Sequence, residues 1–429
     1  MLIYQEKTRL SRVTGFTENN NTYQVSKGNI IWLNNGKEAN QLSHNILEVT
    51  CFNLKYPGGI PSNLRNLEKG LTGLGNRVFI SGMKDSLIDK VLVYLKYFGS
   101  ENSFFYNFRC LLERQAKKTI KFIDAMQIDI INCHDVAICS FLLDRTNKPI
   151  ILTIHGPFSK EIEMYGLGGT LYHKAIIEME KKCYSDKRLL FIAVDSGQKN
   201  ILTQEFNVDP EKIFVIFNSV DTLKFHPLDP PEKGNYVLVP RRLVMKNGCH
   251  IAIEALKYID KEIRIVFAGD GPKKHELISL SRKLGVKDRV EFLGSLPNDK
   301  ILELMQRALA VIIPSIPSSG VIEASSIAML EGMSVGKPVI ASAIGGMKEI
   351  ISDGETGILV EPGNKTQLAD SVNWVINNPN KADEMGNRAR SYVIKNHSPS
   401  NQAERYLEVY YRAISFNNVH MMAESYKGH

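Results

Sequence analysis

The segment that decides the fold is residues 323–342, which read EASSIAMLEGMSVGKPVIAS. Ser325 and Ser326 are residue types that commonly cap helices. Residues 327–335 have helical spacing, and Gly336 with Pro338 ends the run. The sequence therefore predicts a polar loop that leads into a short helix.

Two glutamates flank the start of this helix. Glu323 is expected on the loop before it, and Glu331, eight positions later, about two turns in. Free backbone amides at a helix N-terminus favour a phosphate. A carboxylate on either side of such a turn suits a sugar at one end and a ribose at the other, as a nucleotide-diphosphate sugar requires. The alternative is an ordinary helix with one exposed glutamate after a polar loop.

The order of neighbours resembles the Glu-x7-Glu signature of the family 4 retaining glycosyltransferases. Residues 336–346 are similar to the strand and Gly-Gly turn that follow this helix in the family, and the similarity continues to residue 363. The resemblance covers about residues 47–415. It implies an α/β fold of the GT-B type, with two Rossmann-like domains whose parallel sheets face each other across a cleft. It also implies retaining transfer of a sugar from a nucleotide-diphosphate sugar donor to an acceptor hydroxyl.

Composition is ordinary for a globular protein. The 429 residues are enough for two domains or more, 43% are hydrophobic, and the formal charge is +7. No basic run argues for nucleic acid. The six scattered cysteines favour reduced thiols in the cytoplasm over disulfides or a zinc site. We find neither a signal peptide nor a membrane span, so we expect a cytoplasmic protein.

Two β-α-β alternations divide the chain, one from about residue 47 and one from residue 236. Such alternation predicts parallel sheets covered by helices on both faces. Residues 225–235, rich in proline and charge, are typical of a linker. We expect an N-terminal acceptor domain over 46–225 and a C-terminal donor domain over 236–400. Residues 401–429 would form a tail and a helix that crosses back, as the resemblance implies.

Residues 1–45 precede the point where the resemblance begins. A hairpin is expected over residues 19–35, with Trp32 packed inward. A packing role, an oligomer contact and acceptor binding all remain open for this extension.

Two cations follow the first strand of the second half. Residues 240–248, PRRLVMKNG, resemble the family's Gly-Arg-Leu-x-x-x-Lys-Gly loop, with Arg242 and Lys246 at the cationic positions. Fixed cations can stabilise the charge that develops on a departing diphosphate. Pro240 replaces the family's glycine, which weakens the match at Arg241. The alternative is a solvated basic turn.

No two aspartates are separated by a single residue anywhere in the chain. The Asp-x-Asp pair with which metal-dependent sugar transferases hold a divalent ion is therefore missing. We predict a metal-independent enzyme, with no metal site and no cofactor, for which the nucleotide sugar is a co-substrate.

Further site residues come from the resemblance. Gly59, in the Gly58-Gly59 turn, would let the backbone approach the diphosphate or acceptor. His155 ends a buried strand and would line the sugar side. Gly271 would lie beside the nucleotide, as would Ser325 and Ser326, which together with Glu331 complete the predicted donor site. The alternatives are a plain glycine turn and a structural histidine. His134 is interpreted as structural.

Residues 84–122 combine basic residues with many aromatic ones, including Tyr94, Tyr97 and Phe98. A basic amphipathic helix of this kind can lie on an anionic membrane, here the inner face, whereas an ordinary domain helix is the alternative.

Two other functions compete with transfer, namely a GT-B nucleotide-sugar epimerase and a non-catalytic GT-B partner subunit. Glu323, Arg242 and Lys246 together favour transfer. UDP is the expected nucleotide by analogy with the family. The acceptor could be a saccharide, a lipid-linked group or another hydroxyl compound. The sequence does not determine the acceptor, the donor sugar or the oligomeric state.

Overall fold

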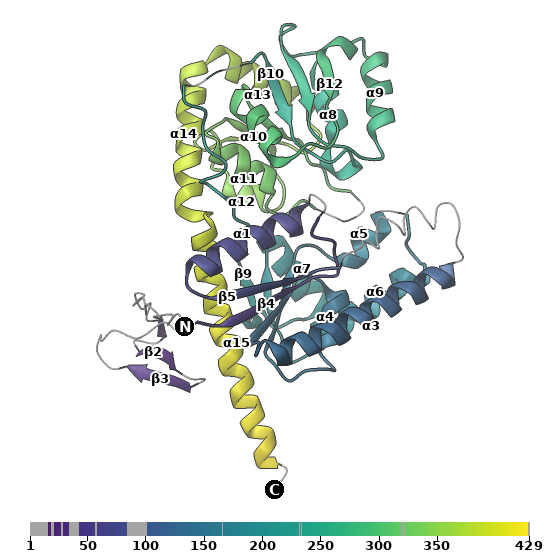
Figure 1. Ribbon diagram of the computed structural model, residues 1–429. Coiled ribbons are helices and arrows are strands. Elements are labelled where there is room, and N and C mark those ends of the chain that lie inside the picture. The colour runs from purple at the N-terminus through teal and green to yellow at the C-terminus, as the bar shows by residue number, and fades with distance from the viewer. Residues whose placement is uncertain are drawn as a thin grey trace, which may run out of the picture.

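The computed structural model describes residues 16–18, 21–26, 29–33, 43–55, 58–83, 101–164, 166–230, 232, 234–318, 320 and 322–427. Within them lie two six-stranded parallel sheets, one above the other in Figure 1, each with helices against it. The predicted α/β architecture of two parallel sheets is confirmed.

The first sheet has the strand order β5-β4-β6-β7-β8-β9. Its strands are β4 (Asn45–Val49), β5 (Arg77–Ser81), β6 (Ile130–Cys133), β7 (Ile150–Ile154), β8 (Leu190–Ala193) and β9 (Ile213–Val215). The helices between them are α1 (Gly59–Gly73), α3 (Glu101–Ala125), α4 (Val136–Leu142), α5 (Phe158–Met164), α6 (Leu171–Ser185) and α7 (Ser196–Phe206). The central strands β6, β7 and β8 are buried along their whole length, as strands covered on both faces must be.

The second sheet has the strand order β12-β11-β10-β13-β14-β15. Its strands are β10 (Tyr236–Val239), β11 (Arg264–Phe267), β12 (Val290–Phe292), β13 (Val311–Ile313), β14 (Val339–Ser342) and β15 (Ile358–Val360). Helices α8 (Cys249–Ala255), α9 (Lys274–Lys283) and α13 (Lys365–Asn377) pack on one face. Helices α10 (Asn298–Arg307), α11 (Ile327–Ser334), α12 (Met347–Ile350) and α14 (Pro379–Asn396) pack on the other.

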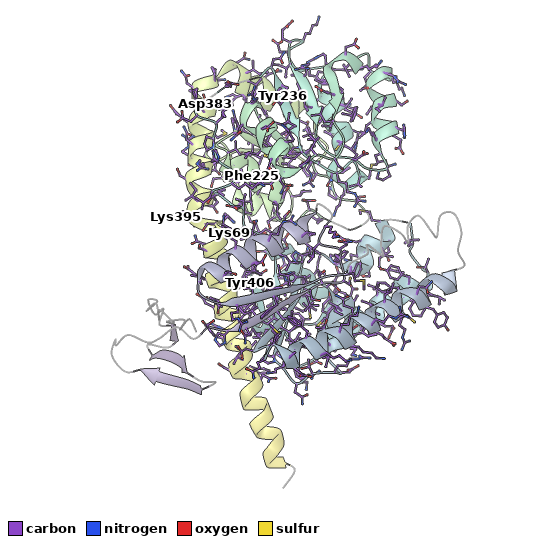
Figure 2. The ribbon with its side chains drawn as sticks, viewed as in Figure 1. Lys69, Phe225, Tyr236, Asp383, Lys395 and Tyr406 are labelled. Atoms are coloured by element: carbon purple, nitrogen blue, oxygen red, sulfur yellow. The ribbon has the colours of Figure 1, made fainter. Side chains whose placement is uncertain are left out.

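The long final helix, α15 (Pro399–Lys427), follows α14 and runs down beside the first sheet (Figure 1). Figure 2 shows Asp383 on α14 beside the second sheet and Tyr406 on α15 beside the first. Tyr406 and Tyr410 are buried against β4, β6 and β7 in a core that also includes Leu67 of α1. The C-terminal helix therefore completes the core of the N-terminal half.

The N-terminal extension contains a three-stranded antiparallel sheet of β1 (Phe16–Glu18), β2 (Asn21–Ser26) and β3 (Asn29–Leu33). Strands β2 and β3 pair as a hairpin, with Ser26 opposite Asn29, as predicted. The packing of the Trp32 side chain lies outside the described residues.

Helix α3 has one face in the core, through Phe108 and Leu112, whereas Tyr106 is 65% exposed beside the exposed Arg109. Residues 84–100, including the aromatic residues predicted there, lie outside the described residues. Membrane contact through this segment stays a prediction. No helix in the described part of the chain is both long and apolar enough to cross a membrane.

Candidate active site

A cavity of about 730 Å³ lies between the carboxyl ends of the two sheets. Open parallel sheets bind ligands at this edge because the loops leaving the strands converge there. The predicted residues that line it are Gly59, His155, Arg242, Lys246, Glu323, Ser325, Ser326 and Glu331. The structure thus brings eight predicted residues, from both halves of the chain, to one cavity.

Gly271 is the predicted site residue that the cavity lining does not include. A Cβ atom at this position would lie 2.4 Å from the carbonyl oxygen of Leu243, so the glycine packs against the loop after β10. Its neighbours Gly269 and Asp270 line the cavity in its place. Gly271 therefore packs against the loop after β10, and its place beside the nucleotide stays a prediction.

Glu323 is held in an ion pair that the sequence analysis missed. Its Oε1 atom lies 2.9 Å from Nη2 of Arg241, and the two side chains are only 15% and 9% exposed. Burial opposes ionisation of Glu323, but the charges of Arg241 and Lys246 outweigh it and hold the pKa of Glu323 below its usual value. Glu323 is thus a carboxylate fixed in position at neutral pH.

Arg241 also orders the loop around this pair. Its guanidinium donates hydrogen bonds to Oγ of Ser326 at 2.8 Å and to Oδ1 of Asn247 at 2.5 Å. The backbone approaches Gly269 so closely that a Cβ atom there would lie 2.1 Å from the carbonyl oxygen of Arg241. Of the two adjacent arginines, Arg241 is therefore the buried one that contacts Glu323, whereas Arg242 lies exposed at the rim.

Lys246 connects the two halves across the cavity. It lies in a short 3-10 helix (Met245–Asn247), and its Nζ atom is 3.6 Å from Oε1 of Glu161 on α5. Gly248 follows with φ at +62°, and a Cβ atom there would lie 1.8 Å from the carbonyl oxygen of Pro314. Only glycine fits this position, so the loop that carries Lys246 has a fixed path.

The N-terminus of α11 faces the same cavity. Ser326 occupies the N-cap position, but its side chain makes no cap hydrogen bond, and its Oγ atom accepts from Arg241. The Oγ atom of Ser325 accepts instead from the backbone N–H of Asn218 at 3.2 Å. The helix therefore starts where predicted, with Ser326 at the N-cap position, but the two serine side chains are engaged by Arg241 and Asn218.

Glu331 is the fifth residue of α11, so it lies little more than one turn into the helix. It is partly exposed and lines the cavity. Burial raises the pKa of Glu331 to about 8, and the charges of Lys224 and Arg65 reduce this effect only in part. Glu331 is therefore mostly protonated at neutral pH, unlike Glu323.

His155 directly follows β7 and lines the cavity from the N-terminal half. Its Nε2 atom lies 2.9 Å from Nδ1 of His134, and the two rings are stacked. Burial, followed by the effect of His134, holds the pKa of His155 well below its usual value, so the imidazole is neutral. The interpretation of His134 as merely structural overlooked this contact, which no sequence motif indicates.

Gly59 is the first residue of α1, and a Cβ atom there would meet nothing within 4 Å. Open space therefore lies against the helix start, on the cavity side. Asn63 of the same helix donates a hydrogen bond to Oδ1 of Asn218 at 2.6 Å, and Asn218 in turn donates to the carbonyl oxygen of Ser325 at 2.9 Å. The starts of α1 and α11 are thus connected through one asparagine.

Two family descriptions match consecutive parts of the chain. The sequence model described as "Glycosyltransferase Family 4" matches residues 57–224, and that described as "Glycosyl transferases group 1" matches residues 221–392. The two matched segments meet at residues 221–224. This boundary lies shortly after Asn218, which connects the starts of α1 and α11.

Individual proteins agree with this assignment. An uncharacterized glycosyltransferase of Methanocaldococcus jannaschii is 28% identical over 395 residues, which cover 85% of this chain and 98% of that protein. An MMP alpha-(1->4)-mannosyltransferase of Mycolicibacterium hassiacum is 24% identical over 62% of this chain and 66% of that protein.

Solved structures share the fold. HepE of Anabaena, solved in complex with UDP, superposes with a TM-score of 0.66 at 19% identity, over 85% of this chain and 98% of that one. A sucrose-phosphate synthase of Thermosynechococcus elongatus superposes with a TM-score of 0.65 at 16% identity, over 90% of this chain and all of that one.

Proposed function

Because the chain belongs to glycosyltransferase family 4 and has the GT-B fold, we propose that it is a retaining, metal-independent hexosyltransferase. Its donor is a UDP-sugar, and its acceptor is a hydroxyl of a saccharide or lipid-linked compound. The product would enter a polysaccharide, a glycolipid or another glycoconjugate in the cytoplasm.

The observation that carries this proposal is the arrangement of Glu323, Arg241 and Glu331 around the start of α11. Glu323 is an ion-paired carboxylate on the loop, and Glu331 lines the same cavity from within the helix. A nucleotide-diphosphate sugar would lie across the helix start, where the positive end of the helix dipole favours the diphosphate. Glu323 then faces the sugar, and Glu331 accepts hydrogen bonds from the ribose hydroxyls.

The leaving group is stabilised by cations built into the protein. As the bond between the sugar and the diphosphate breaks, negative charge grows on the diphosphate oxygens, and Arg242 and Lys246 stabilise that charge. Lys246 exchanges its contact with Glu161 for the phosphate when the donor binds. Arg241 is already engaged by Glu323, so its task is to hold that carboxylate in place.

The N-terminal half supplies the other wall of the site. His155 lines the sugar side as a neutral imidazole, so it can exchange hydrogen bonds with sugar hydroxyls without adding charge. The open space at Gly59 admits the diphosphate or the acceptor to the start of α1. The acceptor hydroxyl enters between these two positions.

UDP is the preferred nucleotide in this proposal because the structural relative HepE was solved with UDP and also with UDP-glucose. The identities of those ligands belong to HepE, whose sequence is distant from this one. The nucleotide therefore needs a direct test.

A donor screen tests the proposal. The purified chain is mixed with UDP, GDP and ADP sugars in excess EDTA, and thermal stabilisation and nucleotide release are measured together. We expect stabilisation by UDP sugars and a slow release of UDP, in which water takes the place of the acceptor hydroxyl and the free sugar is the second product. Conversion of the sugar without nucleotide release would identify an epimerase instead. Stabilisation without any turnover, with or without acceptor, would identify a binding subunit.

A further inference from the structure

A chain of buried polar side chains runs from the C-terminal helix to the active-site cavity. Tyr410 of α15 donates its hydroxyl to Oε1 of Glu48 at 2.6 Å, and Oε2 of Glu48 lies 2.7 Å from Nε2 of His134. Nδ1 of His134 then lies 2.9 Å from Nε2 of His155. The side chains of Glu48 and His134 are both 0% exposed.

Glu48 is an unusual residue for its position. It lies on β4 between Leu47 and Val49, inside the core, where an unpaired charge would be strongly destabilising. Two groups donate to its carboxylate, namely the hydroxyl of Tyr410 and Nδ2 of Asn132 at 2.8 Å, and Nε2 of His134 lies 2.7 Å from Oε2, with Nδ2 of Asn132 3.2 Å from the same ring nitrogen. Such a carboxylate is a strong and fixed acceptor, so it determines where the proton on His134 lies.

We propose that Glu48 and His134 are positioning residues that hold His155 in a single tautomer and orientation. The carboxylate of Glu48 accepts from Nε2–H of His134, which leaves Nδ1 of His134 unprotonated. Nδ1 of His134 then accepts a hydrogen bond from Nε2–H of His155. Nδ1 of His155 is therefore unprotonated and can accept a hydrogen bond from another group. A carboxylate that accepts a hydrogen bond from one ring nitrogen of a histidine leaves the other ring nitrogen unprotonated, as an acceptor.

The consequence for the reaction rests on the proposed function. His155 lines the sugar side of the cavity, so an unprotonated Nδ1 can accept a hydrogen bond from a hydroxyl of the transferred sugar. The opposite tautomer would present a donor there. Tyr410 of α15 lies at the other end of this series of hydrogen-bonded side chains. The C-terminal helix therefore helps to determine the geometry of the site.

The test compares two isosteric changes in the same half of the molecule. Glu48→Gln removes the carboxylate charge that orients the His134 and His155 side chains. Glu180→Gln, the matched control, changes another fully buried carboxylate, which accepts from the backbone N–H of Ser159 at 3.0 Å and lies outside the cavity lining. We expect Glu48→Gln to lower kcat about tenfold to a hundredfold with little change in donor KM. Glu180→Gln is expected to leave both parameters near their wild-type values.

A second readout does not depend on activity. In ¹⁵N-histidine NMR spectra, with His155 assigned by its loss in His155→Asn, we expect Nε2–H alone in the wild type and a mixture of tautomers in Glu48→Gln. His134→Phe, which keeps the stacked ring and removes the acceptor, serves if Glu48→Gln does not fold. A wild-type His155 that is protonated on Nδ1 would overturn the proposal. So would a folded variant that keeps both the wild-type tautomer and the wild-type kcat. If the wild type has the expected His155 tautomer but no transferase activity, the proposed function is refuted. The positioning role of Glu48 and His134 would still stand.

Discussion

At the scale of single residues, the two glutamates of the signature differ in their electrostatic environment. Glu323 is ionised because Arg241 and Lys246 outweigh the effect of burial, whereas burial raises the pKa of Glu331 to about 8. Glu323 has a fixed ion-pair partner 2.9 Å away, and Glu331 lines the open cavity from the helix. The same residue type therefore has two different roles in the proposed site.

The first prediction separates these roles by kinetics. In the proposed site Glu323 would lie by the reacting sugar, where contacts strengthen as charge develops, so Glu323→Gln should mainly lower kcat. Glu331 would bind the ribose equally in the ground and transition states, so Glu331→Gln should mainly raise donor KM. Steady-state kinetics of both variants decide the matter. The reverse pattern, or no change in either variant, would refute the assignment.

The second prediction follows from the raised pKa of Glu331. At pH 7 its carboxyl is mostly protonated, and ribose hydroxyls that donate to it would stabilise the carboxylate and lower its pKa. Nucleotide binding should therefore release a proton at pH 7, and affinity should rise with pH until about pH 8. Calorimetry in two buffers of different ionisation enthalpy measures this release. The release should disappear in Glu331→Gln, and an undiminished release in that variant would contradict the prediction.

Some of these residues could be predicted from sequence and some could not. Glu323, Glu331 and Lys246 follow strand ends or a helix start, where chain order places side chains at the cavity. Arg241 was missed because the resemblance placed Arg242, and not Arg241, at the family's cationic position. The inward direction of the Arg241 side chain is seen only in its contacts with Glu323 and Ser326, which lie far away in sequence. His134 was underestimated because its contact with His155 joins two strands.

At the scale of elements, the loops around α11 fit each other closely. Gly345 has φ at +50°, and a Cβ atom there would lie 1.8 Å from the carbonyl oxygen of Glu323. The Gly-Gly turn after β14 therefore determines the position of the loop that carries Glu323. Glycine is required here both by conformation and by space.

The third prediction tests this fit with a matched pair. Gly345→Ala should displace the loop of Glu323 and lower kcat about tenfold to a hundredfold. Gly363→Ala has a similar conformational cost, since φ is +82°, but nothing lies within 4 Å of the added Cβ atom. It should cost about 1 kcal/mol of stability and leave kcat unchanged. Equal kcat values for Gly345→Ala and Gly363→Ala would show that the contact between residue 345 and Glu323 does not affect catalysis.

Strands buried in the parallel sheets were predicted better than the short helices. The strands Arg77–Ser81, Ile150–Ile154 and Tyr236–Val239 fall within the two predicted β-α-β alternations, because strands of a covered parallel sheet are short apolar runs with clear ends. Helix α11 is one residue shorter than predicted, ending at Ser334. The short helices α5 and α12 were not predicted, because segments of 7 and 4 residues have too few turns to show a period.

At the scale of the whole molecule, polar contacts join the two halves of the chain. Lys246 reaches Glu161 across the cavity, and the backbone N–H of Ser196 donates to Oε1 of Glu349 at 3.2 Å. Helix α15 packs its apolar face on the first sheet after leaving the second half. The arrangement of two parallel sheets could be predicted from the repeated β-α-β pattern. These contacts could not, because they join residues that lie far apart in the chain.

The central claim is that built-in cations, rather than a divalent metal ion, stabilise the leaving diphosphate. The most direct measurement is the rate of UDP release from a UDP-sugar in excess EDTA, for the wild type, Arg242→Ala and Lys246→Ala. We expect the wild type to remain active in EDTA and each variant to lose about a hundredfold in turnover while remaining folded. A wild type that is inactive in EDTA and restored by manganese, or an Arg242→Ala or Lys246→Ala variant that turns over at the wild-type rate, would contradict the account.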